Sequence, residues 1–298
     1  MVGKNPPPKP KDSLGPDDLV RNLTQLPSSP AVLPRLMDIL RDNMSALEDS
    51  AALIKLDSGI AARVLQMANS SYYGKRERCY DVEEAVGRVG VVKVYELVAF
   101  AATAPLLMRR LATYEIEADD LWRLSVTCAL ASEQLAVSAG YDVNIAYTTG
   151  LLHGAGMVAV DLWAAGQPHP LRLRHLGLPD ESTADEKRLI GFTSANVAAA
   201  LLKSWGFASA VIEPVRWQYD PRFAGGHVNI ACGLHVAKWL RDAVHVADDA
   251  PRPPMPQQFA LDHLRLTKDD LEAYRTEVKE AWAHAVELLD ESPEGAAE

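Results

Sequence analysis

Apolar side chains recur at the spacing of an α-helix along almost the whole of this chain. One such stripe lies on a single helical face, at positions i, i+3, i+4 and i+7, and consists of Leu33, Leu36, Met37 and Leu40. Very few segments alternate apolar and polar residues with the period of two that a half-buried β-strand shows. The spacing therefore predicts an all-α fold.

Local signals also predict where helices begin and end. Pairs with the spacing of a capping box mark helix starts at Ser45 with Glu48, Asp81 with Glu84, and Thr267 with Asp270. After the helix that begins near residue 59, Gly74 is expected to take the positive φ of a C-cap. The stretch 145–163 is apolar nearly all round, which predicts one central buried helix.

Shifts in composition divide the chain. Pro and Lys dominate the N-terminal tail, and the stretches 166–180 and 248–258 are rich in Pro, which predicts loops or linkers. We therefore distinguish a flexible tail (1–16), an N-terminal helical part (17–112), a second helical part (113–247), a linker with a C-terminal helix (248–290) and an acidic tail (291–298).

The charge balance disfavours polyanionic partners. Lys and Arg total 30 against 40 Asp and Glu, which gives a formal net charge of −10. A negative field repels nucleic acids and anionic membranes, so we expect neither as a partner. Nucleic-acid binding would have to use a local patch such as Arg172, Arg174 and His175, and it would depend strongly on salt.

No segment has the pattern of a targeting or membrane-spanning sequence. The N-terminus lacks the apolar stretch of a secretory signal. The longest apolar run, 91–108, contains Lys93, Glu96 and Pro105, and it is too polar to span a bilayer. We expect a cytoplasmic protein.

Residues with metal-binding chemistry are scattered. Cys79, Cys128 and Cys232 form no CxxC pair, and the histidines have no second histidine or carboxylate at metal-ligand spacing in an apolar helix. His153 and His235 lie on apolar helical stretches, where a buried, hydrogen-bonded histidine is the more common role. The sequence predicts no metal.

A short motif with two glycines is similar to a dinucleotide-binding loop. Residues 154–159 fit the GxGxxA spelling of a dinucleotide-binding loop, which requires a strand before it and a helix after it. The residues before Gly154 have a helical pattern instead. Small residues that let two helices approach closely are the favoured interpretation, and no cofactor is expected.

Several motifs follow one another in a set order along the chain. The stretch 150–156 resembles the AGLLHD helix of HD phosphohydrolases. The stretch 57–74 is similar to the DPxLxxxLLxxANSxxYG signature of HDOD domains, which are HD-related output domains of bacterial signalling proteins. The remaining matches are 26–30 to LPxLP, 83–90 to AIxxLG, 121–123 to the start of the helix with the first HD histidine, 186–205 to ExxxxGFxHxxxGxxLxxxW, and 216–221 to RxHHxP. The resemblance spans residues 18–245 and implies a multi-helix HD-like bundle with an N-terminal helical subdomain.

The departures from this pattern concern the metal ligands. The positions that align with the ligands of HD enzymes hold Leu124, His153, Gly154, Ser194, Gln218, Tyr219 and His235. Of the usual ligands only His153 remains, whereas a catalytic metal needs at least three ligands and an open position. The resemblance therefore implies a degenerate HD part over 113–247 without metal, cofactor or enzymatic activity.

The resemblance implies a signalling or adaptor role. We expect a module that binds a partner protein in a bacterial signal-transduction pathway. Cyclic di-GMP signalling is one pathway to which it could be linked. One alternative is a sensor that binds a nucleotide or cyclic dinucleotide in the vacated HD cleft, with phosphate contacts from Arg63, Arg88, Lys93 or Arg216. A further alternative is residual phosphohydrolase activity.

The most specific part of the resemblance contains Asn69, Ser70, Tyr72 and Tyr73. Tyrosines at such a site could dock a partner, because tyrosine is enriched at interface hot spots. A structural clasp between two helices is the favoured interpretation, because Gly74 indicates a tight chain reversal.

Overall fold

The computed structural model describes residues 14–23, 30, 32–41, 46–70, 72–74, 77–168, 171–173, 179–247 and 250–290. Within these ranges the elements are helices, and the only β-type pairing is an isolated bridge between Leu111 and Ile116. The all-α prediction is confirmed. Residues 1–13 of the predicted tail (1–16), the whole predicted acidic tail (291–298) and residues 26–29 of the LPxLP match (26–30) lie outside the described residues. Pro16, the last residue of the predicted N-terminal tail, begins the first helix.

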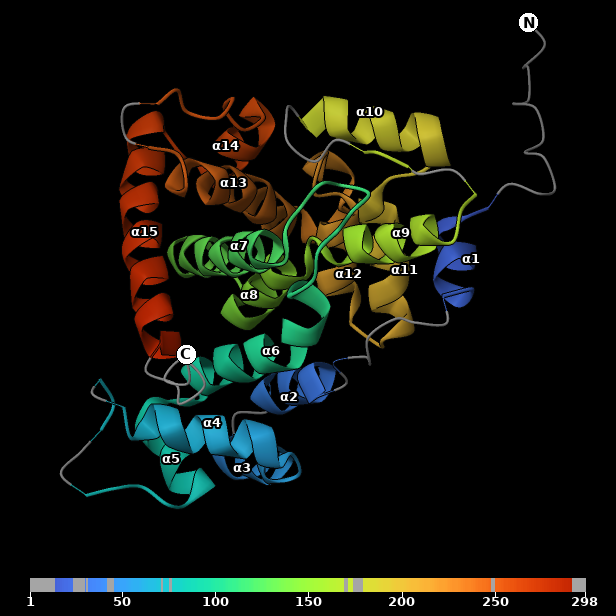
Figure 1. The fold of residues 1–298 in the computed structure, drawn as a ribbon. Helices are drawn as coiled ribbons and strands as arrows, with labels where there is room; N and C mark the ends of the chain where they lie inside the picture. The colour runs from blue at the N-terminus through green and yellow to red at the C-terminus, as the bar shows by residue number, and fades with distance from the viewer. Residues whose placement is uncertain are drawn as a thin grey trace, which may run out of the picture.

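One group of helices lies at the bottom of Figure 1. It consists of α2 (Val32–Arg41), α3 (Ala46–Lys55), α4 (Ser58–Ala68) and α5 (Val82–Val89). These four pack against one another, and α6 (Val91–Leu107) packs on all of them. Because α6 also contacts α7 and α8, it joins this N-terminal group to the rest of the molecule.

The second group forms the larger bundle. Its pairs are α7 with α8, α7 with α13, α9 with α11, and α12 with α8 and α13. The bounds are α7 (Ala118–Ala139), α8 (Val143–Leu152), α9 (Ala155–Ala165), α10 (Pro179–Ile190), α11 (Ser194–Ser204), α12 (Ser209–Arg216) and α13 (Val228–Val244), with η1 (Pro221–Phe223) and η2 (Gly225–His227) between the last two.

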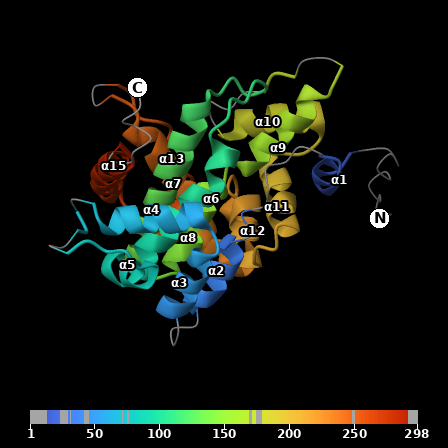
Figure 2. The same ribbon diagram turned by 60° about the horizontal axis from the view of Figure 1, so that its bottom comes forward.

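The first and last helices both pack on this bundle. The short α1 (Pro16–Arg21) contacts α9 and α11 rather than α2–α5, and it lies apart from them in Figures 1 and 2. At the other end, α14 (Gln258–Leu264) packs on α13, and α15 (Lys268–Asp290) packs along α7 and α13. The predicted division of the chain into parts stays a prediction.

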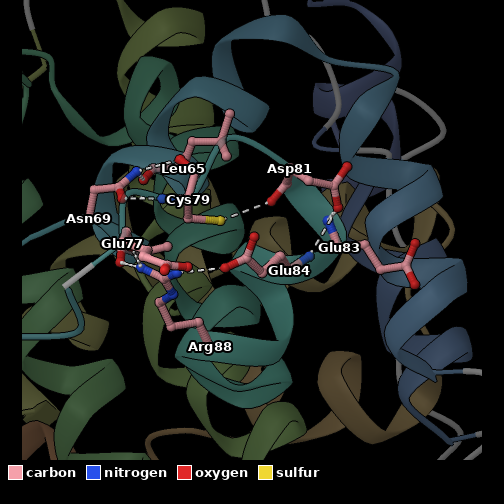
Figure 3. Close-up of polar contacts among 9 residues, drawn as sticks. Leu65, Asn69, Glu77, Cys79, Asp81, Glu83, Glu84 and Arg88 are labelled. Carbon is pink, nitrogen blue, oxygen red and sulfur yellow. Dashed lines mark hydrogen bonds and ion pairs between the residues drawn. The ribbon is translucent and has the colours of Figure 1, made fainter. Parts of the chain in front are cut away.

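Two capping predictions are confirmed. The Asp81 carboxylate accepts hydrogen bonds from the backbone N–H groups of Glu83 (2.9 Å) and Glu84 (3.1 Å), as Figure 3 shows. At α15 the hydroxyl of Thr267 accepts from the N–H of Asp270, whose carboxylate accepts from the N–H of Thr267. Ser45, the third predicted cap, lies outside the described residues.

The predicted single helix over 145–163 is wrong, because the chain breaks between α8 and α9 at His153 and Gly154. The side-chain amide of Gln218 donates to the carbonyl of His153 at 3.1 Å, so this carbonyl is engaged outside the helix. Both halves are buried all round, and periodicity therefore cannot reveal the break.

Close helix contacts explain the glycines near this break. A Cβ on Gly156 would lie 1.9 Å from the carbonyl oxygen of Ser194, and one on Gly150 would lie 2.6 Å from that of Cys128. These residues bring α9 against α11 and α8 against α7. The interpretation of the GxGxxA motif as a close contact between helices is confirmed. The segment before the motif is the helix α8, not the strand that a dinucleotide-binding loop requires.

The predicted role of Gly74 is wrong, since its φ is not positive. Its N–H donates to the carbonyl of Ser70 at 2.7 Å, and a Cβ would lie 2.5 Å from that same oxygen. Close approach, rather than a left-handed backbone, is what requires glycine here. The loop predicted over 166–180 is too long, because α10 begins at Pro179. The helix α14, which lies within 248–290, was not predicted.

Among the described residues, no single helix is both long and apolar enough to cross a membrane. Helices α5 and α6 together are long and apolar enough to cross a membrane, but the chain bends by 111° between them.

Candidate functional site

Residues that align with HD ligands meet where the α8–α9 break faces the end of α12 and the middle of α13. Gln218 connects the two histidines: its side-chain amide donates to the carbonyl of His153, and its own carbonyl accepts from Nδ1 of His235 at 3.0 Å. Both histidines are 8% exposed. Three of the predicted positions therefore form one buried polar cluster.

Both ring nitrogens of His153 are engaged. Nδ1 lies 2.6 Å from the carbonyl oxygen of Gly150, and Nε2 lies 2.7 Å from a guanidinium nitrogen of Arg241. A carbonyl only accepts and a guanidinium only donates, so the proton is assigned to Nδ1 and the ring is neutral. Burial and the positive charges of Arg241 and Lys238 hold the pKa of His153 well below 6.5.

His235 is bonded in the same way. Its Nδ1 donates to the carbonyl of Gln218, and its Nε2 accepts from the backbone N–H of Gln257 at 3.2 Å. Burial lowers the pKa of this ring as well. The Nε2 lone pair of each remaining histidine is thus used by a donor of the protein itself.

The donor to His235 belongs to the proline-rich segment before α14. Gln257 also donates from its side chain to the carbonyl of Tyr219 at 2.9 Å. Nearby, the indole N–H of Trp239 donates to the carbonyl of Pro253 at 3.1 Å. The segment predicted as a linker therefore lies against the HD-like positions of α13.

Other predicted positions lie around this cluster. A Cβ on Gly154 would lie 3.3 Å from Leu121 and 3.9 Å from the hydroxyl of Ser125, and no other atom lies within 4 Å. Leu124 is partly buried on α7 but is not among these neighbours. On α7, the side chains nearest to Gly154 are therefore those of Leu121 and Ser125.

Ser194 belongs to a second polar cluster around Glu186. The backbone N–H of Ser194 donates to one carboxylate oxygen of Glu186 at 2.8 Å, and the hydroxyl of Tyr114 donates to the other at 2.8 Å. Burial raises the pKa of Glu186, while the N–H of Ser194 opposes this rise. The pKa of Tyr219 is also raised, first by burial and then by the charge of Glu186.

Two cations at the site were not predicted. Lys238 lies 2.8 Å from the side-chain oxygen of Gln218, and its ammonium lies 3.6 Å from the centre of the Tyr219 ring. Arg241, 15% exposed, holds Asp242 through two nitrogens at 2.7 and 3.0 Å. A Lys-x-x-Arg spacing on a largely apolar helix, directly after His235, was the signal that could have found them.

The donors at these positions do not fit a metal. Within the described ranges, no group of three or more His, Cys, Asp and Glu side chains is arranged to hold an ion. A hydrolytic metal centre needs such a group and an open position. Here two histidines have occupied Nε2 atoms, and Lys238 and Arg241 bring positive charge to the same place.

Of the four predicted loop residues, Asn69 forms a structural clasp (Figure 3). The side-chain amide of Asn69 donates to the carbonyls of Leu65 (2.7 Å) and Cys79 (2.8 Å), and its oxygen accepts from the N–H of Cys79 at 2.8 Å. Arg88 adds a bond to the carbonyl of Glu77 at 3.1 Å. Asn69 therefore joins the end of α4 to the residues before α5.

The neighbouring loop residues differ in exposure. The hydroxyl of Ser70 donates to the carbonyl of Met67 at 2.8 Å. Tyr72 is 66% exposed, and its ring lies 4.7 Å from that of Tyr73 and 4.6 Å from that of His284 on α15. The exposed ring of Tyr72 is thus available at the surface, whereas Asn69 and Ser70 are engaged with the backbone.

The basic residues considered for phosphate contact have partners elsewhere. Arg88 pairs with Glu84, Lys93 with Glu96 and Glu133, and Arg216 with Glu213. Of the patch considered for nucleic acids, Arg172 pairs with Glu115, and Arg174 and His175 lie outside the described residues. None of these is among the polar partners of the HD-like cluster.

The fold and these positions define the class of protein: an all-helical, HD-related domain whose ligand positions have diverged. Within that class, the family model of the HDOD domain matches residues 26–221. The chain belongs to the HDOD family.

The chain is also similar to a known protein whose function is not described. An uncharacterized protein of Treponema pallidum is 27% identical over 212 residues, which cover 68% of this chain and 39% of that protein. The chain thus spans about two fifths of the length of this relative.

Two solved structures share the fold. An HDOD domain protein of unknown function from Geobacter sulfurreducens matches with a TM-score of 0.68 and 20% identity, over 92% of this chain and 97% of that one. A candidate phosphohydrolase from Shewanella amazonensis matches with a TM-score of 0.63 and 21% identity, over 92% and 97%.

Proposed function

We propose that this protein is a non-catalytic HDOD signalling adaptor that binds a partner protein in the cytoplasm of a bacterial cell. One observation carries the proposal: Nε2 of His153 accepts from Arg241, and Nε2 of His235 accepts from Gln257. The atoms through which these histidines would bind a metal are used by the chain's own donors. What remains of the HD site serves packing and hydrogen bonding.

Charge supports the same conclusion. A divalent metal beside His153 would lie next to Arg241, and Lys238 acts on the same ring. Like charges at such distances in a buried site repel strongly. The aligned positions Gly154 and Ser194 supply neither a carboxylate nor an imidazole in compensation.

A docking surface for the partner is available at the N-terminal group of helices. Large apolar side chains are exposed at Leu56 (80%), Tyr72 (66%) and Tyr80 (79%). The Asn69 clasp holds the chain on both sides of this loop, so the two tyrosines are presented at limited cost in conformational entropy. The proposal extends to a signalling pathway, with cyclic di-GMP turnover as the first to examine.

Affinity capture with surface variants tests the adaptor role. The full chain carries a tag in its native cell, and Y80S is compared with wild type and with F223S, which changes an exposed aromatic residue elsewhere. We expect the same partner with wild type and F223S and its loss with Y80S. No protein above background, or equal recovery from all three, would contradict the proposal.

Enzyme assays test the non-catalytic part. The purified protein is incubated with Mn²⁺, Fe²⁺ or Zn²⁺ and given bis(p-nitrophenyl) phosphate or cyclic di-GMP. We expect no turnover and less than about a tenth of an equivalent of retained metal, because an HD centre needs its ligands. Turnover that H153A removes would show that the site is a hydrolase.

A further inference from the structure

The two cations of the HD-like cluster have too little negative charge beside them. Lys238 and Arg241 are one turn apart on α13 and close enough for Arg241 to act on the charge of Lys238. In the described part of the chain, the only carboxylate in contact with either is Asp242, which binds Arg241 and is 42% exposed. Two positive groups thus share one partly solvated counter-charge.

Among the described residues, no carboxylate is in ion-pair contact with Lys238, and burial followed by the charge of Arg241 lowers the pKa of Lys238 to about 7. Its contacts are a neutral amide oxygen, on Gln218, and the face of the Tyr219 ring. The charges of Asp242 and Glu186 act on it only from beyond ion-pair distance. Burying an ammonium group without an ionic partner is costly, and such groups are normally paired or bind a charged ligand.

The geometry leaves donors available for a ligand. An ammonium group has three N–H donors, and the recorded acceptor of a Lys238 hydrogen bond is the oxygen of Gln218. The ammonium of Lys238 is buried, but part of the Lys238 residue is exposed and the side chain of Arg241 is 15% exposed. A small anion could therefore reach both from the surface of α13.

We propose that Lys238 and Arg241 form a binding site for a small phosphate-type oxyanion, either free phosphate or the phosphate group of a small molecule. Lys238 supplies charge and free N–H donors, and Arg241 supplies the second positive group one turn further along α13. Gln218 holds the Lys238 ammonium, and Tyr219 covers it on one side. The site does not depend on the partner binding proposed above.

Calorimetry and thermal unfolding of the full chain test this site. The probes are inorganic phosphate, pyrophosphate, AMP and cyclic di-GMP, with sodium chloride at equal ionic strength as the reference. K238M removes the charge at nearly constant volume, and K203M makes the same change at an exposed lysine of α11. Saturation with phosphate alone would indicate free phosphate, and saturation only with AMP or cyclic di-GMP would indicate a phosphorylated small molecule.

We expect wild type and K203M to bind at least one probe and K238M to bind it at least about tenfold more weakly. Without a probe, K238M should have an equal or higher Tm, because it removes an unpaired buried charge. This keeps loss of binding distinct from unfolding. R241K, which keeps the charge but loses the planar fork, should bind a few-fold more weakly. No saturable heat with any probe in wild type, or equal binding by K238M, would overturn the site.

Discussion

The guanidinium of Arg241 donates to Nε2 of His153 at 2.7 Å, although the two residues are 88 positions apart. The imidazole can accept this bond only as the neutral ring with its proton on Nδ1, where Gly150 provides the acceptor. A positively charged side chain thus lies against the atom through which a histidine of this kind would bind a metal.

Removal of Arg241 should raise the pKa of His153. After burial, the charge of Arg241 is the largest influence that keeps the pKa low. In R241A the pKa should move up toward 6.5, measured by NMR titration of the ring protons. R21A removes an exposed arginine that pairs with Asp18 on α1, and it should leave the titration unchanged. A pKa of His153 that stays low in R241A would show that burial and the charge of Lys238 control it without Arg241.

Gly156 should tolerate no side chain. A Cβ would lie 1.9 Å from the backbone oxygen of Ser194, and backbone cannot move aside as a flexible side chain can. G156A should lower the free energy of unfolding by about 3 kcal/mol in urea denaturation, since α9 and α11 must separate. At Gly226 no atom lies within 4 Å of a Cβ, so G226A should cost less than about 0.5 kcal/mol. Equal effects would contradict the close helix contact.

The Asn69 clasp should require an amide. N69D keeps the oxygen that accepts from the N–H of Cys79, but it places a carboxylate against the carbonyls of Leu65 and Cys79. We expect a loss of about 2 kcal/mol in the free energy of unfolding, as large as for N69A. Urea denaturation provides the measurement, and N22D makes the same change at an exposed position after α1. An N69D protein as stable as wild type would refute the clasp.

The ion cluster between α6 and α7 should make stability depend on pH. Lys93 lies 2.7 Å from Glu96 and 3.0 Å from Glu133. Burial, followed by the charge of Glu133, raises the pKa of Glu96 from 4.5 to about 8. The folded state therefore binds more protons than the unfolded state between these values, and stability falls as pH rises through this window.

The variant E96Q should reduce that fall, since the amide resembles the protonated acid. We expect wild type to lose roughly 1–3 kcal/mol between pH 5 and pH 8 relative to E96Q, from urea denaturation at several pH values. The exposed pair of Glu115 with Arg172 provides the control E115Q, which should follow wild type. Parallel curves for wild type and E96Q would show that Glu96 is ionised throughout.

Local patterns predicted the regular parts of the fold well. The start of the helix Val82–Val89 was predicted from its capping box, and in the structure Asp81 caps this start and Gly90, with φ +94°, follows its end. Both signals lie within a few residues of the helix they control. In contrast, at the break the carbonyl of His153 accepts a hydrogen bond from Gln218, which is 65 positions away.

In the candidate site, too, local sequence signals predicted some features, whereas contacts between distant residues decided others. The loss of ligand-type residues at Gly154 and Ser194 can be read from the order of motifs along the chain. The Lys-x-x-Arg spacing of Lys238 and Arg241 on an apolar helix is a weak local signal, because it does not show which groups these side chains meet. Their importance comes from the groups they meet, which are His153 from α8 and Gln218 and Tyr219 from the end of α12.

By itself, the sequence determined the helical class, the HDOD resemblance and the residues that occupy the old ligand positions, since these depend on identity and local spacing. Only the tertiary structure decided that the Nε2 atoms of His153 and His235 are occupied and that two cations lie beside them. The physical reason is that hydrogen bonds and charges act through space. These contacts form only when helices that are distant in sequence pack against one another.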